Sequence, residues 1–133
     1  MGTTWFPTGV DTQLRDKNRT QRKTTTYTVT AADNATSFVS KATTVYTLPS
    51  TLSGLLYTFV NEGKDGICQI SVSPAAADGI NGAGVTTVIN KDIINTLATS
   101  KKGDYILIAA GAGAAGVTAW SVVAQRGIWA KEA

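Results

Sequence analysis

Two neighbouring segments in the middle of the chain carry the clearest pattern of hydrophobic and polar positions. Residues 55–60 are apolar, aromatic or β-branched, and after them Cys68, Ile70 and Val72 alternate with polar residues. A period of two is typical of a half-buried strand, because successive side chains leave opposite faces of the backbone. The intervening segment 61–66 contains two glycines, which readily take the positive φ of tight turns. The stretch from Gly54 to Pro74 therefore predicts a β-hairpin.

Further segments rich in β-branched and aromatic residues predict strands on both sides of this hairpin, at residues 27–30, 38–39, 44–48, 105–108 and 117–123. Turn-forming residues separate them, such as Asp33 and Asn34, whose side chains bond to nearby backbone. Residues 85–89 could add a strand, and residues 91–98 have a short helical spacing of apolar positions. Many short strands between closely spaced turns favour an all-β fold, a compact antiparallel sandwich or barrel that is jelly-roll-like.

The first part of the chain has a different composition. Residues 1–26 are polar and basic and have too little apolar surface to offset the entropy of ordering them. We therefore expect an extended N-terminal arm at 1–26 and a β-sandwich or barrel domain at 27–133. The arm should bind neighbouring molecules, with an apolar plug and a basic run facing acidic surface; these residues are Trp5, Phe6, Arg15, Lys17, Arg19, Arg22 and Lys23.

Charge narrows the choice of partner for this arm. The formal net charge is only +3, and no aromatic residue lies between Arg15 and Lys23 to stack on bases. Both features disfavour nucleic acid as the partner of the arm. Two interpretations stay open: the arm binds a protein, or it is a solvated tail without a partner.

The length and the cysteine content limit the possible number of domains and disulfides. A chain of 133 residues suits one domain with one core, and a single cysteine, Cys68, excludes an intrachain disulfide framework. We expect Cys68 to be a small core residue. The N-terminus has no basic leader or long apolar run, and no segment approaches the roughly 20 apolar residues of a membrane-spanning helix. These features predict a protein that is made in a reducing compartment and does not bind membranes.

One apparent nucleotide-binding motif lacks its structural context. Residues 111–116 spell G-x-G-x-x-G after a predicted strand. A dinucleotide site also needs a helix after the glycines and an acidic residue about 20 positions further on. Here a strand pattern follows and the chain ends too soon, so the tract predicts a hairpin loop.

The residue inventory does not favour catalysis. The chain has no histidine, the usual general base, and its nine carboxylates show no spacing typical of a paired acid and base. Cys68 has no neighbouring base to activate it. We therefore expect no enzyme activity, cofactor or metal. Trp120 and Trp129 fit core positions better than a sugar-binding platform.

Several motifs occur in a characteristic order after the arm: TYTVTAAD, VYTLPSTLSGLLYTFVN, ISVSPAAADGINGAG with a D-x-I-x-G turn at 78–82, KKGDYILI, and the ending WSVVAQRGIW. In this order the chain resembles β-rich virion modules of tailed bacteriophages, most of all capsid decoration (cement) proteins. It departs from them in the apolar tract 111–116, where such modules usually carry a polar turn.

This resemblance implies a virion structural protein on the capsid exterior, assembled in the host cytoplasm, that stabilises the head. Its partner would be the major capsid protein, with self-association as a homotrimer or, alternatively, a dimer. The resemblance also leaves open a tail-fibre or spike module that contacts a host receptor. A weaker third hypothesis is a carbohydrate-binding domain that uses Trp120 or Trp129.

Overall fold

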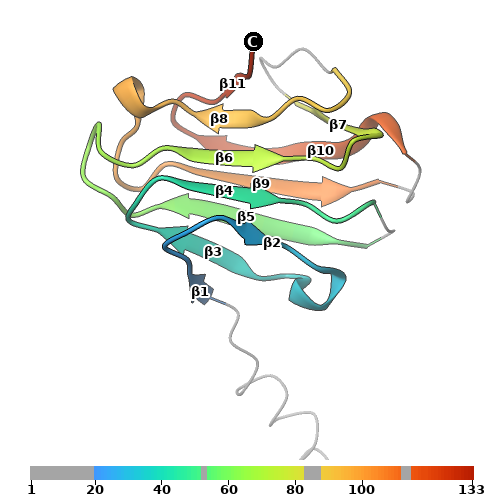
Figure 1. Ribbon diagram of the computed structural model, residues 1–133, viewed down its shortest axis with the longest axis horizontal. Helices are drawn as coiled ribbons and strands as arrows, with labels where there is room; N and C mark the ends of the chain where they lie inside the picture. Colours follow the sequence, from blue (N-terminus) through green and yellow to red (C-terminus); the bar gives the residue numbers. More distant parts are fainter. Residues whose placement is uncertain (1–19, 52–53, 83–87, 112–114) are drawn as a thin grey trace, which may run out of the picture.

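The computed structural model describes residues 20–51, 54–82, 88–111 and 115–133, which form two β-sheets packed face to face (Figure 1). The six-stranded sheet has the order β1 (Thr20–Arg22), β3 (Ser37–Ser40), β5 (Leu56–Asn61), β9 (Tyr105–Ala110), β10 (Gly116–Arg126), β7 (Asp78–Asn81). The five-stranded sheet has the order β11 (Ala130–Lys131), β8 (Ile93–Asn95), β6 (Ile70–Ser73), β4 (Thr44–Thr47), β2 (Tyr27–Thr28). Two 3₁₀ turns, η1 (Ala31–Asp33) and η2 (Leu97–Thr99), complete the elements. The all-β class is confirmed, and of the predicted sandwich and barrel the two packed sheets are compatible with the sandwich.

The chain alternates between the two sheets from β1 to β9. Among the first six strands, those two apart in sequence lie side by side and run parallel: β1 with β3, β3 with β5, β2 with β4, and β4 with β6. Parallel neighbours need a crossover connection, and here a strand of the opposite sheet supplies it. The prediction of an antiparallel order is wrong for this half of the molecule, and the strand order does not confirm a jelly roll.

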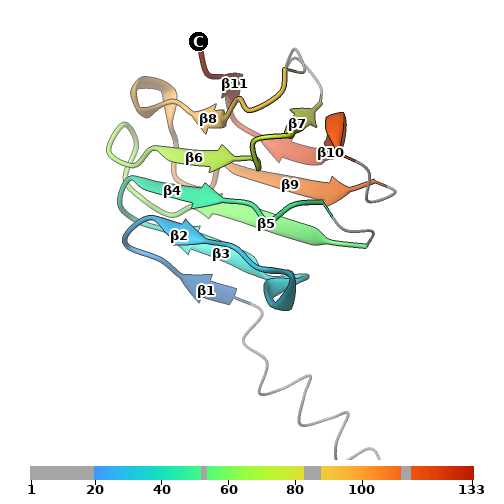
Figure 2. The same ribbon diagram turned by 45° about the vertical axis from the view of Figure 1, so that its right-hand side comes forward.

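The predicted central hairpin is also wrong, although both of its strands exist. β5 lies in the six-stranded sheet between β3 and β9, whereas β6 lies in the five-stranded sheet between β4 and β8. The loop that joins β5 to β6 crosses from one sheet to the other (Figure 2). The two alternating patterns face each other across the core, which buries their apolar residues as well as a shared sheet face would.

Aromatic rings fill the space between the sheets. Phe38 and Phe59 are direct register partners on β3 and β5, and their rings stack with centroids 5.6 Å apart. Tyr46, from the opposite sheet, lies 4.8 Å from the Phe59 ring. Such pairs add to the stabilisation from burial. The core positions expected from sequence are buried: Tyr57, Phe59, Cys68, Ile70, Val72, Trp120 and Trp129.

Three local expectations change. The sheet begins at Thr20, inside the segment assigned to the arm, because β1 pairs with β3. The expected D-x-I-x-G turn is strand β7, which runs parallel to β10. The helical spacing at 91–98 corresponds to strand β8 followed by η2.

Two further local predictions can be compared with the structure. In the expected turn at 31–34, Asp33 accepts hydrogen bonds from the hydroxyl of Tyr27 and the backbone N–H of Thr30. Most of the strand suggested at 85–89 lies outside the described residues. Where the structure describes the chain, no helix is long and apolar enough to cross a membrane.

Candidate functional site

The structure describes two of the seven predicted contact residues of the arm, Arg22 and Lys23, and both contact other residues of this chain. Nη2 of Arg22 forms an ion pair with Oε1 of Glu62 at 3.3 Å. Nζ of Lys23 lies 3.7 Å from the centroid of the Tyr27 ring, a cation–π contact. The other predicted contact residues lie outside the described residues: Trp5, Phe6, Arg15, Lys17 and Arg19. Their role in partner binding stays a prediction.

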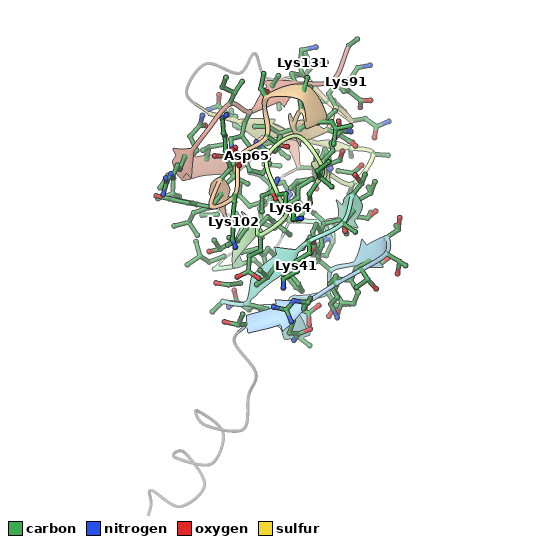
Figure 3. The ribbon with its side chains drawn as sticks, turned by 90° about the vertical axis from the view of Figure 1, so that its left-hand side faces the viewer. Lys41, Lys64, Asp65, Lys91, Lys102 and Lys131 are labelled. Carbon is green, nitrogen blue, oxygen red and sulfur yellow. The ribbon has the colours of Figure 1, made fainter. Side chains whose placement is uncertain are left out.

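One end of the sandwich carries a cavity of about 470 Å³, which we call the lysine cavity; it is lined by Lys41, Glu62, Gly63, Lys64, Ile67 and Lys102. Three loops supply these residues: the β3–β4 turn, the β5–β6 loop and the segment between η2 and β9. Figure 3 looks onto this end and shows Lys41, Lys64 and Lys102 gathered there. These loops lie close together because β3 and β5 end, and β9 begins, at the same end of the sandwich (Figure 1).

The three cavity lysines carry unneutralised charge. Among the residues that the structure describes, no carboxylate lies within ion-pair distance of Lys41, Lys64 or Lys102. Glu62, which also lines the cavity, is already paired with Arg22. At the rim, Asp65 pairs with Lys101 at 3.7 Å. The cavity is therefore electropositive.

Other lysines of the domain have partners. Nζ of Lys91 donates to the carbonyl of Ala133 at 2.8 Å, and Nζ of Lys131 donates to the carbonyl of Glu132 at 2.9 Å. These two lysines lie near the C-terminal strand, away from the cavity (Figure 3). The ammonium groups of Lys91 and Lys131 thus bind backbone carbonyl groups of this chain, whereas those of the three cavity lysines are available to a ligand.

A buried asparagine holds the β5–β6 loop in place. Nδ2 of Asn61 donates to the carbonyl of Cys68 and to Oδ1 of Asn95, both at 2.9 Å. Its Oδ1 accepts from the backbone N–H of Gly63 at 2.9 Å. All three amide positions of this side chain are used in a site that is closed to solvent. Such a fully satisfied buried network makes the loop rigid.

Backbone hydrogen bonds join the three loops to one another. The N–H of Glu62 donates to Ser40 at 2.8 Å, the N–H of Gly66 to Ser100 at 2.9 Å, and the N–H of Gly103 to Asn61 at 2.7 Å. The backbone of Gly63 lies close to Cys68 and Lys41. A β-carbon added at Gly63 would collide with Cβ of Cys68 and lie 3.0 Å from the carbonyl oxygen of Lys41. The backbone that carries the lysines is therefore fixed before any ligand arrives.

The Gly-Asp strand entry and the final G-x-W belong to the same structure. The buried carboxylate of Asp104 accepts from Nδ2 of Asn95 at 3.0 Å and from the backbone N–H of Lys101 at 2.9 Å. Nδ2 of Asn95 also donates to the carbonyl of Ile128 at 3.1 Å, and Nε1 of Trp129 donates to the carbonyl of Arg126 at 3.0 Å. These motifs therefore have structural roles beneath the cavity.

Cys68 lies under the cavity but is not exposed to it. Burial raises the pKa of its thiol, and the hydrogen bond from the Gly63 backbone lowers that pKa by less. Its sulfur lies 3.7 Å from the carbonyl oxygen of Ser40. A neutral, buried thiol is a poor nucleophile. Within the described ranges, no group of three His, Cys, Asp or Glu side chains is placed to hold a metal ion.

The glycine-rich tract at 111–116 joins two antiparallel strands. β9 ends at Ala110 and β10 begins at Gly116, so a strand follows where a dinucleotide site would need a helix. The prediction of strands on both sides is confirmed. Residues 112–114 within the tract lie outside the described residues.

The local sequence does not predict that Lys41, Lys64 and Lys102 line one cavity. Each of its lysines follows or precedes a turn signal, but nothing in the local sequence places the three turns at one end of the molecule. No protein-family model, curated protein or solved structure matches this chain.

Proposed function

We propose that this protein is a bacteriophage virion structural protein that binds the outside of the assembled capsid as a decoration, or cement, protein and stabilises the head. Its partner is the major capsid protein, and it self-associates as a homotrimer, with a dimer as the alternative. It assembles in the host cytoplasm. The order of sequence motifs described above motivates the proposal, and two features of the fold support it.

The first feature is the open edge of the two sheets, formed by β1 and β2. Within the described residues, β1 has a strand neighbour only in β3, and β2 only in β4. Both edge strands lie at the same margin of the molecule, beside the point where the chain enters the sandwich (Figure 2). An edge strand can pair with a strand from another chain, and the arm itself can add to a neighbour's sheet. The edge formed by β1 and β2 therefore suits attachment to another protein.

The body of the domain suits a structural role. Between the two sheets, the described residues form a core of packed aromatic and aliphatic side chains. A rigid, well-packed body transmits force between contacts without local unfolding. Such a body with an extended arm is what a cement protein requires, because it must span neighbouring shell subunits and resist their separation.

Co-sedimentation with shells of the parent phage that lack this protein tests the proposal. We expect the protein to pellet with the shells and to saturate at a fixed ratio to the major capsid protein. Protein that stays in the supernatant at saturating concentration would contradict the proposal. Antibody label confined to the tails of intact virions would favour the tail-fibre alternative instead.

A further inference from the structure

The lysine cavity has the properties of a preformed binding site. Its volume of about 470 Å³ lies within the range of ligand pockets in proteins. Its three loops are held by the Asn61 network and by backbone bonds between the loops. A site fixed in this way loses little entropy when it binds, which favours affinity.

The charge of the lining selects an anionic ligand. Three lysines face one glutamate, and that glutamate is paired with Arg22. The lining therefore carries an excess of positive charge, which attracts a carboxylate or phosphate that enters the cavity. A neutral or cationic ligand would not gain this attraction.

The rest of the lining favours a polypeptide over nucleic acid. Ile67, which lines the cavity, is 62% exposed to solvent and offers an apolar contact. Among the described residues that line the cavity there is no aromatic ring for base stacking and no arginine for bidentate phosphate contacts. Carboxylates next to an apolar side chain match three lysines around an isoleucine.

We propose that the lysine cavity binds an acidic polypeptide segment, with Asp or Glu side chains against Lys41, Lys64 and Lys102 and an apolar side chain against Ile67. The proposal rests on the geometry of this cavity and does not depend on attachment to a capsid. It assigns a second contact surface at the loop end of the sandwich, bordered by the ion pair between Glu62 and Arg22 of β1.

Binding of a labelled peptide to the full-length protein tests this assignment. The probe is a twelve-residue peptide of repeated Glu-Glu-Leu, followed by fluorescence anisotropy at low salt, and a peptide with Gln in place of Glu is its control. We expect the acidic peptide to bind and the Gln peptide not to bind. The affinity should fall as salt is added, because exposed charges are screened.

Two triple variants with the same change in charge locate the site. Lys41→Gln/Lys64→Gln/Lys102→Gln should weaken binding by about tenfold or more, ~1.4 kcal/mol. Lys91→Gln/Arg126→Gln/Lys131→Gln changes basic residues outside the cavity lining and outside the predicted arm, and should weaken binding less than about threefold, ~0.7 kcal/mol. Equal losses in the two variants, or no loss in the first, would overturn the proposal.

The apolar contact and the class of ligand need separate measurements. Ile67→Ser should weaken the Glu-Glu-Leu peptide but leave a peptide of Glu-Glu-Ser repeats unaffected. Tighter binding of a twelve-nucleotide oligothymidylate, lost in the cavity variant, would assign the cavity to nucleic acid and overturn the polypeptide assignment. Thermal unfolding of each variant shows that it is folded, and these exposed positions should tolerate substitution.

Discussion

The carboxylate of Asp104 occupies the space that a β-carbon at Gly127 would need. Gly127 also has φ +91°, a conformation that side-chain-bearing residues rarely adopt. The contact joins the entry to β9 with the turn after β10. It explains in structural terms why the sequence carries both Gly103-Asp104 and the final Gly127-Ile128-Trp129.

Replacing Gly127 with alanine should therefore destabilise the domain through two effects. The left-handed conformation costs about 1–2 kcal/mol and the collision with Asp104 about 1–3 kcal/mol more. Gly54→Ala is a matched control, because Gly54 has φ +89° but nothing within 4 Å of the added carbon. Urea unfolding should show a larger loss for Gly127→Ala. Equal losses would mean that the Asp104 contact contributes nothing.

Asn61→Ala should release the loops of the lysine cavity. The substitution leaves Oδ1 of Asn95 and the N–H of Gly63 with fewer partners in a buried site, which costs about 2–4 kcal/mol. Amide hydrogen exchange should quicken at Gly63 and Gly103. Thr58→Ala, on the same strand, should cost less than about 1 kcal/mol and leave that exchange unchanged. Slow exchange at Gly63 in Asn61→Ala would contradict the anchoring role.

Stability should fall at alkaline pH because of buried tyrosines. Burial raises the pKa of Tyr46 to about 12, and that of Tyr57 also to about 12, from 10.0. Between pH 10 and 12 the unfolded chain loses these protons while the folded chain keeps them. The folded state therefore binds more protons there, so the free energy of unfolding decreases as pH rises. Below pH 10 these groups leave stability unchanged.

Urea unfolding across this pH range, with tyrosinate absorbance as a second probe, measures the effect. Tyr46→Phe should reduce the slope of stability against pH. Because burial also raises the pKa of the Cys68 thiol, both proteins should carry Cys68→Ala. An unchanged slope in Tyr46→Phe would show that Tyr46 does not titrate as expected.

Removing residues 1–19 should separate folding from attachment. We expect the far-ultraviolet circular dichroism and the thermal midpoint to stay unchanged, since β1 begins at Thr20. Binding to shells, or self-association, should fall by about tenfold or more, ~1.4 kcal/mol. Removing residues 1–26 should also destabilise the sandwich, because it deletes β1 from beside β3. A protein without residues 1–19 that binds and assembles like the full chain would show that the attachment surface lies on the sandwich.

Of the candidate sites, local sequence identified only the basic arm. A run of basic residues in a polar segment is visible without any structure, and so is the failure of the glycine-rich tract at 111–116 to precede a helix. The lysine cavity was not visible, because Lys41, Lys64 and Lys102 are far apart in sequence and each is an ordinary loop lysine. Only the shared end of the stacked strands makes them neighbours.

The sequence by itself determined the all-β class and the buried apolar residues of the two central strands, β5 and β6. The alternation around Cys68, Ile70 and Val72 requires one apolar face, and burying that face is favourable in any arrangement of sheets. Only the tertiary structure decided which strands pair. Backbone N–H and C=O groups are the same in every strand, so β5 satisfies them as well beside β3 and β9 as it would beside β6. The packing of Phe38, Tyr46 and Phe59 between two sheets accompanies the crossing arrangement, and local patterns do not encode such contacts.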